Sequence, residues 1–580
     1  MKKSVFKKLL VAIMALSMTI TLLAACANNG DPDPTPAADA DTEAPADPDP
    51  DPADDDGDVD DADDEDADVV EAPAGEARRI TTALQASAVQ VFRDDDSFYD
   101  NLWTRLIKER LNIDVEVIFT ADASTDAYMN QMNLLLATGD LPDVLRWGSR
   151  EWFREAQEAG LLMDITDVFM ENASPEVLAF MDRYPDSFDG VSVDGRLYGF
   201  PFMNNNFHQV SYLWIRDDWL EYAGGNPPET VEEMLAMARL FANGDPNGDG
   251  SSVFGLALGD DVIRGNYGSI GGLIAAFGVP NLDSNGIFYR GDDGLITFSY
   301  IQPEVRYALE IVHELFVEGV IDPEFMVKDI PTLETDFALG RIGMTYHRNW
   351  GTWHPFPGVR NEFGVITRPY PIPRMEGFPV RQGIRNNSLG DFFVISANAE
   401  HPEAIIEIIN LYYEVAVSGT QEQFMTYWAD EQYRLAPIFI GIPTENFAPE
   451  VIAALEAGSS EGLVGQPLSL FDFVIGFEDG SMADDANAFG TWGQMSEFGS
   501  MRIALDHLAA GEIVQEVMGA DVPPTWLQNS SILVDHTRTN FVHFVTGQRS
   551  LDEFDDFVQE WLNMGGQQVL DEMNELYPLN

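Results

Sequence analysis

The clearest pattern of apolar and polar residues comes early in the folded part of the chain. Residues 80–84 and 115–119 are short apolar runs typical of strands, and residues 141–145 begin a third. Apolar residues recur at helical spacing between the first two runs, over 98–107, and between the last two, over 124–139. The order strand, helix, strand, helix, strand predicts an α/β fold with a parallel sheet and crossover helices.

The ends of these elements carry recognisable signals. Asp96 and Ser97 are candidate caps for the first helix, and Gly139 is a suitable residue to end the second. In parallel sheets ligands bind beyond the carboxyl ends of the strands. We therefore expect residues 146–148, which include Trp147, to line a cleft.

The N-terminus has the pattern of a targeting segment. Four lysines precede an apolar run over 9–23, and the only cysteine, Cys26, ends the sequence Leu-Ala-Ala-Cys. A basic region, an apolar region and small residues before a cleavage point are typical of a secretory signal peptide. The Leu-Ala-Ala-Cys ending resembles a bacterial lipobox, which implies a lipoprotein signal peptide at 1–25 and diacylglycerol (with palmitate) on Cys26. The alternative is a buried structural cysteine.

The next segment, residues 26–77, is an acidic tether by composition. From Asp31 to Glu76 it is nearly all Asp, Pro and Ala, with 21 acidic residues and no lysine or arginine. Such a segment cannot bury enough apolar surface to offset its ordering entropy, so we expect it to be disordered. A polyproline-like chain of this length reaches about 140 Å. The alternative is an acidic tail that serves only solubility.

Charge excludes several classes of partner. The net charge is −66, and −49 remains after the four N-terminal lysines and the 21 tether acids are set aside, since 28 − 77 = −49. Nucleic-acid binding needs basic patches, so nucleic acid is excluded as a partner. Anionic polymers and anionic lipid surfaces are disfavoured for the same reason. Adaptation to a salty habitat is the preferred explanation of the acidic surface.

Length and hydropathy predict how the chain after the tether is organised. About 500 residues follow the tether, which is too long for one core and predicts two or more lobes. No later apolar run reaches the roughly 18 residues that a membrane span requires. A lipid on Cys26 would then be the membrane contact, which suits a binding or processing protein better than a channel.

Five segments together resemble one family. They read GDLPDV at 139–144, DGRLYGFP at 194–201, WIRDDWL at 214–220, LFVEGVIDPEF at 315–325 and HPEA followed by NLYYE within 401–414. In this order they resemble the extracellular solute-binding proteins, family 1, the lipoproteins that serve carbohydrate importers and are similar to maltose-binding-type proteins. No segment of the last 150 or so residues resembles a family motif.

That resemblance implies a two-lobe, periplasmic-binding-protein-like fold (type II) with discontinuous lobes joined by a hinge. Lobe I is expected at 78–201 plus about 390–430, and lobe II at 202–389 plus part of 431–580. The first crossing is expected near 198–202 and the return near 392–395. Closure of such lobes is a two-state movement that ligand contacts favour.

Candidate ligand-binding residues follow from the needs of neutral sugars, which are held by aromatic rings and planar polar side chains. Residues 343–353 resemble the stretch of maltose-binding proteins in which a tryptophan stacks on sugar, and Trp350 falls at that position. Arg348 and Trp353 belong to the same segment, and Trp147 follows a predicted strand. The structural alternative for the tryptophans is packing against nearby prolines.

Two polar segments add further candidates. Asn204 and Asn205 follow the first expected crossing and offer amide groups to sugar hydroxyls, with a polar turn as the alternative. Asp245, Asn247 and Asp249 have the spacing that begins an oxygen-ligand calcium loop. The later carboxylate positions of such a loop fall on Val253 and Leu256, so a structural Ca²⁺ site is incomplete, and no other cofactor is expected.

Enzyme motifs are missing from the sequence. His313-Glu314 starts like a zinc-protease helix, but residue 317 is valine, and no Walker loop or G-x-S-x-G elbow is present. The sequence therefore predicts a monomeric, non-enzymatic, lipid-anchored protein on the extracytoplasmic face of a Gram-positive cell membrane. It would capture a sugar or oligosaccharide and deliver it to the permease subunits of an ABC importer. The alternatives are a surface glycosidase, which needs two paired carboxylates, and a peptide-binding or sensing lipoprotein.

Overall fold

The computed structural model describes residues 75–86, 92–93, 95–122, 126–202, 209–282, 286–386, 391–428, 432–439 and 444–579. The predicted signal peptide, Cys26 and nearly all of the predicted tether lie outside these residues, as do Asn204 and Asn205. Within the described ranges no helix is both long enough and apolar enough to span a bilayer.

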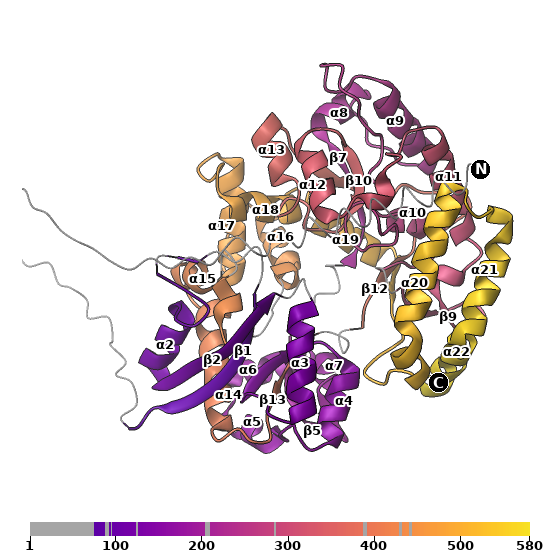
Figure 1. Ribbon diagram of the computed structural model, residues 1–580. Helices are drawn as coiled ribbons and strands as arrows, with labels where there is room; N and C mark the ends of the chain where they lie inside the picture. Colours follow the sequence, from indigo (N-terminus) through magenta and orange to yellow (C-terminus); the bar gives the residue numbers. More distant parts are fainter. Residues whose placement is uncertain are drawn as a thin grey trace, which may run out of the picture. The chain divides into compact units, whose positions relative to one another are not determined.

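One hydrophobic core surrounds a five-stranded sheet, and we call this part lobe I (residues 78–202 and 391–439; Figure 1). The strands, in spatial order, are β2 (Ile113–Asp122), β1 (Arg78–Ala86), β3 (Val144–Trp147), β13 (Phe392–Ile395) and β6 (Gly199–Pro201). Strand β1 pairs in parallel with β2 and β3, as predicted, while β13 is antiparallel to β3 and β6. The two segments expected near the crossings are therefore adjacent strands of the lobe I sheet.

Helices cover this sheet on both faces (Figure 1). They are α2 (Leu102–Leu111), α3 (Asp126–Thr138), α4 (Arg150–Glu158), α5 (Thr166–Asn172), α6 (Pro175–Arg183), α7 (Pro185–Asp189), α14 (Pro402–Tyr412) and α15 (Gln421–Tyr427), with a π-turn at Tyr413–Val417, a 3-10 turn at Gln432–Leu435 and a hairpin of β4 (Ser192–Val193) and β5 (Arg196–Leu197). Helix α3 ends before Gly139, whose φ of 69° is left-handed, as the sequence predicted. The cap of α2 differs from the prediction, because Asn101 accepts from the backbone of Trp103 and Thr104 in a capping box.

A second part of the described chain, which we call lobe II (residues 209–386 and 444–579), has its own cores. Its strands are β7 (Tyr212–Arg216), β10 (Met344–His347) and β11 (Thr367–Tyr370) in one antiparallel sheet, the parallel pair β12 (Gln382–Ile384) and β14 (Ile513–Gln515), and the hairpin β8 (Phe288–Arg290) and β9 (Ile296–Phe298). Strand β7 is the central strand of the first sheet, in the order β10-β7-β11, and all five of its residues are buried. Continuous burial of this kind requires cover on both faces.

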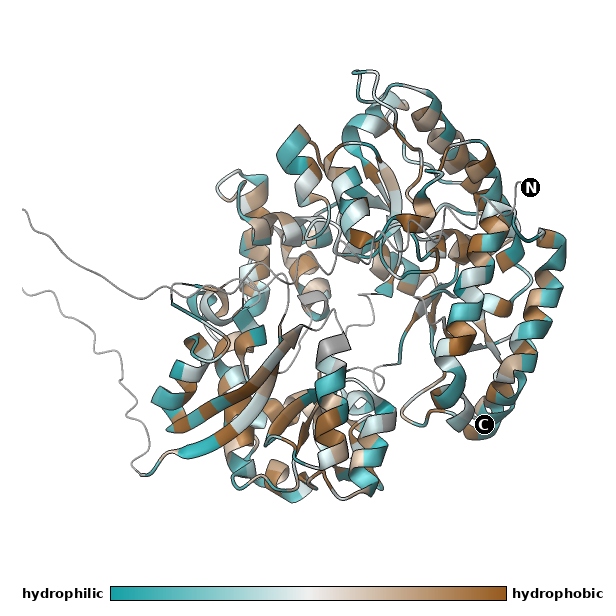
Figure 2. Cartoon of the chain, in the orientation of Figure 1, coloured by the Kyte–Doolittle hydropathy of each residue, from teal (hydrophilic) through white to brown (hydrophobic). Residues whose placement is uncertain are grey.

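Helices from the middle and the end of the chain make up the rest of lobe II. They are α8 (Asp217–Tyr222), α9 (Val231–Asn243), α10 (Gly271–Ala276), α11 (Val305–Val317), α12 (Ile330–Ala338), α13 (Pro357–Phe363), α16 (Ala448–Ala457), α17 (Gln466–Glu478), α18 (Ala486–Met495), α19 (Ser500–Ala509), α20 (Pro524–Thr546), α21 (Phe554–Trp561) and α22 (Gln567–Leu576), with 3-10 turns at Ser299–Ile301, Phe325–Val327, Thr444–Phe447 and Leu551–Glu553 and a π-turn at Leu562–Gly566. Trp561 stacks on Phe298 with ring centroids 5.0 Å apart. The C-terminal residues, which carry no motif, are therefore part of the lobe II core, and Figure 2 shows hydrophobic residues along these helices.

A half-buried carboxyl group in lobe II makes stability depend on pH. Asp217, at the start of α8, lies 2.9 Å from Arg368, and burial raises the pKa of its carboxyl to about 6. Below the ordinary pKa of an aspartate both folded and unfolded states are protonated, so no stability is lost. As the pH rises from the ordinary pKa of an aspartate to about 6, the unfolded state ionises while the folded state keeps its proton. The free energy of unfolding therefore falls over this range.

We expect Asp217→Asn to be more stable than the wild type at pH 7.5, by about 2 kcal/mol, and equal to it at pH 4 or below. Urea unfolding at the two pH values measures the difference. Asp218→Asn is the matched control, because Asp218 pairs at 2.6 Å with the buried guanidinium of Arg216. Its loss should destabilise the protein at pH 7.5, and equal behaviour of the two variants would contradict this account.

Candidate functional site

The carboxyl edge of the lobe I sheet presents one arginine between aromatic rings. Arg146, which the sequence placed at a cleft, pairs with Asp391 at 2.7 Å and lies over the rings of Phe202 and Phe439 at 4.8 and 5.6 Å. These three partners border the chain segments that connect the lobes. Gly148 allows this approach, because a Cβ there would lie 3.0 Å from the Asp391 Oδ1 atom. The edge of lobe I nearest the connections is thus a charged, aromatic-lined junction.

Trp147 lies in the core of lobe I. Its side chain is 2% exposed, and its ring meets Trp152 edge-on at 5.7 Å. The Nε1 atom is buried and has no hydrogen-bond partner among the described residues. The predicted open aromatic platform is therefore absent at this position in the structure, and the edge of the indole carries the unused donor.

The predicted segment of lobe II forms a folded-back loop after β10. His347 Nε2 lies 3.0 Å from the carbonyl of His354, and the Trp350 ring stands edge-on to His347 at 4.3 Å. Trp350 is half-buried and packs against a lobe II core. The carbonyl of Arg348 accepts a hydrogen bond from Trp214 Nε1 at 3.0 Å, which holds the loop to β7.

Trp353 is the more open of the two tryptophans in this loop, at 37% exposed. Its ring lies against Gly490 of α18, where a Cβ would approach within 2.3 Å of it. The structure thus brings Arg348, Trp350 and Trp353 together on lobe II, and it places Trp147 separately, in lobe I.

A polar cluster beside this loop was not predicted. The Tyr267 hydroxyl donates to the Glu334 carboxylate, which also lies 2.6 Å from His354 Nε2. Burial, with Glu334 as a further cause, raises the pKa of Tyr267. The cluster supplies acceptors and donors for hydroxyl groups, but its members are scattered along the sequence, and no local motif marks them.

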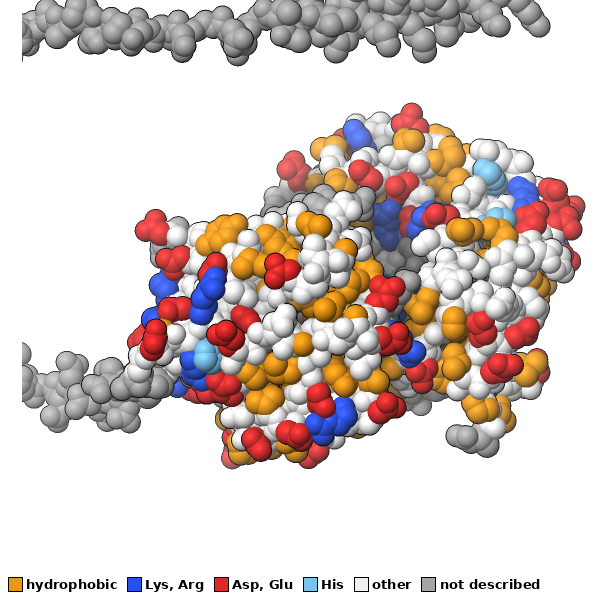
Figure 3. Space-filling view, turned by 60° about the horizontal axis from the view of Figure 1, so that its bottom comes forward, with side chains coloured by type: hydrophobic (Ala, Val, Ile, Leu, Met, Phe, Trp, Pro, Cys, Tyr) orange, Lys and Arg blue, Asp and Glu red, His pale blue; other side chains and the backbone are white. Residues whose placement is uncertain are grey.

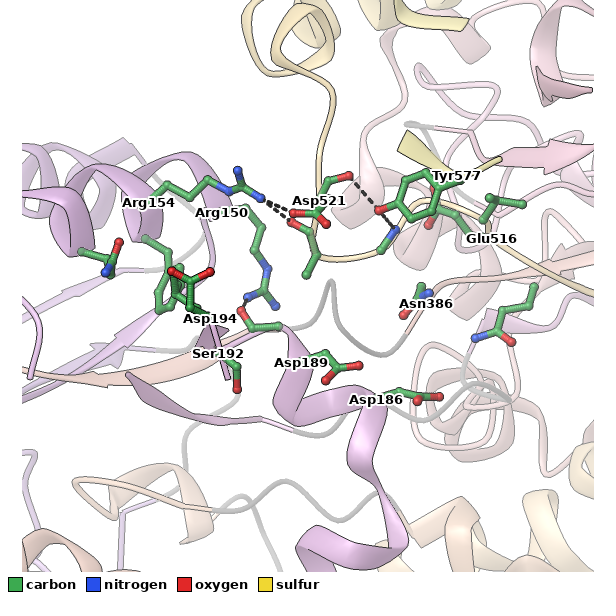
Figure 4. Close-up of a pocket in the computed structure, with 18 of the residues that line it drawn as sticks. Arg150, Arg154, Asp186, Asp189, Ser192, Asp194, Asn386, Glu516, Asp521 and Tyr577 are labelled. Carbon is green, nitrogen blue, oxygen red and sulfur yellow. Dashed lines mark hydrogen bonds and ion pairs between the residues drawn. The ribbon is translucent and has the colours of Figure 1, made fainter. Parts of the chain in front are cut away.

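The described part of the chain contains a cavity of about 920 Å³ lined by both lobes (Figure 4). Lobe I contributes α4, α7 and the β4 hairpin, and lobe II contributes residues 515–521 and Tyr577. Across the cavity, Arg154 of lobe I pairs with Asp521 of lobe II at 2.7 Å. On the lobe II wall, the Tyr577 hydroxyl donates to the Asp521 carbonyl at 2.7 Å. Of the predicted ligand-binding residues that the structure describes, namely Trp147, Arg348, Trp350 and Trp353, none lines this cavity.

The second arginine of the cavity is partly buried. The guanidinium of Arg150 donates to the Gly190 carbonyl and lies 4.4 Å from the Phe392 ring centroid. Burial lowers the pKa of Arg150 to about 10. Arg150 comes three residues after Trp147, the last residue of β3. Its position just beyond a strand end was therefore the sequence signal that could have identified this wall of the cavity.

The lobes also meet away from the cavity. Phe424 of α15 packs with Phe473 of α17 and Ala488 of α18, and Gln421 donates to Asp472 at 3.0 Å. Lobes I and II are therefore in contact at two places, here and through the Arg154–Asp521 pair at the cavity.

The predicted calcium loop holds itself together through its own backbone. Asp245 accepts from the amides of Asp249 and Gly250, and Asp249 accepts from Ser251. Asn247 accepts from the Trp219 indole at 2.9 Å and donates to the Gly340 carbonyl at 2.8 Å. In the ranges that the structure covers, no group of three or more His, Cys, Asp or Glu side chains is arranged to hold a metal ion.

Sequence and structure comparisons agree with a two-lobe binding protein. The pattern of the bacterial extracellular solute-binding protein family matches residues 90–417, so the chain belongs to that family. It is 23% identical over 404 residues to the fructooligosaccharide ABC transporter substrate-binding protein FusA of Streptococcus pneumoniae, covering 66% of this chain and 71% of FusA. The family is one of binding proteins rather than enzymes, and it places the protein outside the cell.

Solved structures show the same fold. An ABC-transporter-associated solute-binding protein of Bifidobacterium longum infantis, described as HMO-binding, aligns with a TM-score of 0.63 and 15% identity over 86% of this chain and 98% of its own. An EF-hand mutant of FusA in complex with fructo-nystose aligns with a TM-score of 0.57 and 15% identity over 86% of this chain and 99% of its own. The prediction of a two-lobe α/β fold is confirmed.

Proposed function

We propose that this protein captures a sugar or oligosaccharide between its two lobes and delivers it to the permease of an ABC importer. The observation that carries the proposal is the 920 Å³ cavity walled by both lobes and crossed by the Arg154–Asp521 ion pair. A site made by two lobes couples occupancy to closure, because ligand contacts to both walls exist only in the closed state. The sugar-binding names of FusA and of the Bifidobacterium protein support the choice of ligand class.

A thermal-unfolding panel tests the ligand class. The chain without residues 1–26 is heated with neutral oligosaccharides, with uronic-acid oligosaccharides and with peptides, and each ligand is analysed afterwards for breakdown. A ligand that binds only the folded state raises Tm by mass action. A shift with an intact sugar supports the proposal. A consumed sugar would favour a surface glycosidase, and a shift with peptides alone would favour a peptide-binding or sensing role.

We also propose that Cys26 carries the lipid anchor, which would hold a monomeric protein at the extracytoplasmic face of a Gram-positive membrane. The position of Cys26 after an apolar segment and before the acidic stretch supports this. Radiolabelled palmitate incorporation into the wild type but not into Cys26→Ala is the direct test. Release of the alanine variant into the medium is the expected accompanying result.

For the loop at Asp245–Ser251 we propose a structural turn in which calcium is not needed for folding. The side-chain oxygen of Asn247 already accepts from the Trp219 indole, and its amide donates to the Gly340 carbonyl. Of the three motif residues, only Asp245 and Asp249 then supply carboxylates. We therefore expect Tm to stay within about 1 °C when EDTA is added, because ligand-linked stabilisation requires an occupied site. A fall in Tm that calcium restores, and that magnesium does not, would establish a calcium site here.

A further inference from the structure

Carboxylates outnumber cations on the walls of the cavity between the lobes. Six of its lining residues are acidic (Glu158, Asp186, Asp189, Asp194, Glu516 and Asp521), and two are arginines. Figure 3 shows acidic side chains spread over the face that is turned forward, and Figure 4 shows Asp186, Asp189 and Asp194 together on the lobe I side of the cavity. Whether a ligand meets net negative charge in the cavity therefore depends on which of these acidic and basic side chains are already paired.

Both arginines of the cavity are already engaged. Arg154 gives its guanidinium to Asp521 at 2.7 Å, across the cavity. Arg150 is directed to the Gly190 carbonyl and packed over Phe392. An anionic ligand that used Arg154 would displace the Asp521 carboxylate, and one that used Arg150 would unpack a partly buried side chain, so neither arginine can meet an incoming negative charge without losing its present contact.

The carboxylates of lobe I, by contrast, have no cationic partner in the described part of the chain. Glu158, Asp186, Asp189 and Asp194 line the cavity, are exposed, and take part in no ion pair there. Asp189 and Asp186 lie close enough to influence each other, since burial and then the charge of Asp186 raise the pKa of Asp189. Concave walls of one sign focus their field into the space between them.

We propose that this cavity accepts neutral oligosaccharides and excludes oligosaccharides of uronic acids. The inference rests on the proposed function and adds the charge class of the ligand. Each ionised carboxylate offers acceptor sites to sugar hydroxyls and no donor. A neutral sugar gains hydrogen bonds from this wall, whereas a uronate brings a like charge to it, and like-charge juxtaposition is an effective means of rejecting a partner.

Calorimetric titration of the chain without residues 1–26 tests the inference, with kestose, maltotriose and xylotriose as neutral probes and trigalacturonate as the anionic probe. At 20 mM NaCl we expect the best neutral trisaccharide to bind at least about tenfold more tightly than trigalacturonate. At 500 mM NaCl, where the Debye length is about 4 Å, the ratio should shrink. Equal affinities at 20 mM, or tighter binding of trigalacturonate, would overturn the inference.

A charge-neutralising pair of substitutions locates the effect. Asp186→Asn with Asp189→Asn should move the affinity ratio toward trigalacturonate by about tenfold at 20 mM NaCl. Glu232→Gln with Glu310→Gln removes the same charge from exposed positions on α9 and α11, outside the cavity lining, and should move the ratio less than twofold. An equal effect of both pairs would assign the selectivity to net charge and overturn the role of the cavity.

A second variant keeps the test decisive if the protein with both Asp186→Asn and Asp189→Asn fails to fold. Asp194 has a left-handed φ of 51°, a conformation that asparagine tolerates well, so Asp194→Asn should fold normally and shift the ratio in the same direction. No shift in either variant would overturn the assignment to this wall. Binding of no sugar by the wild type would instead overturn the proposed function, and this result is distinct from unselective binding.

Discussion

Replacing Trp350 with alanine is expected to weaken sugar binding by about 1–3 kcal/mol, roughly 5- to 150-fold in Kd. Trp350 lies outside the lining of the cavity between the lobes, so this prediction takes the bound sugar to extend to the loop after β10, where the aromatic face would stack on it as on a nucleobase. Trp350 is half-buried beside His347 in a loop that Trp214 ties to β7, so the ring is held in place before ligand arrives. A pre-positioned ring loses little conformational entropy on binding. Calorimetric titration with the best oligosaccharide of the thermal panel measures the loss.

Packing has to be separated from binding in this experiment, because Trp350 also contacts a lobe II core. Trp350→Phe is the matched variant, since phenylalanine keeps an aromatic face. If stacking on sugar is its role, phenylalanine should retain most of the affinity that alanine loses. If Tm falls in Trp350→Ala while Kd stays unchanged, the residue serves packing alone, and the sugar site is confined to the cavity, whose lining does not include Trp350.

The order of elements in lobe I could be predicted because each signal is local. Short apolar runs define β1 and β2, and Gly139 ends α3 with a left-handed φ. The cap of α2 was wrongly assigned to Asp96 and Ser97, although Asn101 was in the sequence. Its capping box with Thr104 requires the helix to begin at Leu102, and the apolar Phe98 had suggested an earlier start.

The cavity could not be predicted, because its walls come together only through tertiary packing. Residues 515–521 begin at the last residue of the short strand β14, which pairs with β12 some 130 residues earlier in the chain. Tyr577 reaches the same wall from the end of the chain, where its hydroxyl holds Asp521. No periodicity or motif connects these segments, so the lobe II wall had no sequence signal.

Trp147 illustrates a different limit. A tryptophan just beyond a strand end suggested an open platform, whereas the structure puts its ring against Trp152 within the lobe I core. Local position does not distinguish the two faces at a strand end, because that depends on which helix covers each face. Here α4, which begins at Arg150 and carries Trp152, covers the face with Trp147.

Lobe I is expected to lose about 3–5 kcal/mol of unfolding free energy in Trp103→Ala. Trp103 is fully buried, stacks on Tyr412 with centroids 5.1 Å apart, and donates from Nε1 to the Gln432 carbonyl at 3.0 Å. It therefore joins α2 to two segments that follow it by more than 300 residues. Truncation removes the buried ring, leaves a cavity, and leaves the Gln432 carbonyl without its donor.

Urea unfolding followed by circular dichroism measures this loss, and the lobe I transition should move to lower urea while a lobe II transition stays in place. Tyr99→Ala is the control, because Tyr99 is 58% exposed in the segment just before α2 and its truncation should change stability by no more than about 0.5 kcal/mol. Trp103→Phe keeps the stacking and loses the hydrogen bond, so it should cost less than the alanine variant and still fold. Coincident unfolding curves for Trp103→Ala and Tyr99→Ala would contradict the role of Trp103 in joining the two halves of lobe I.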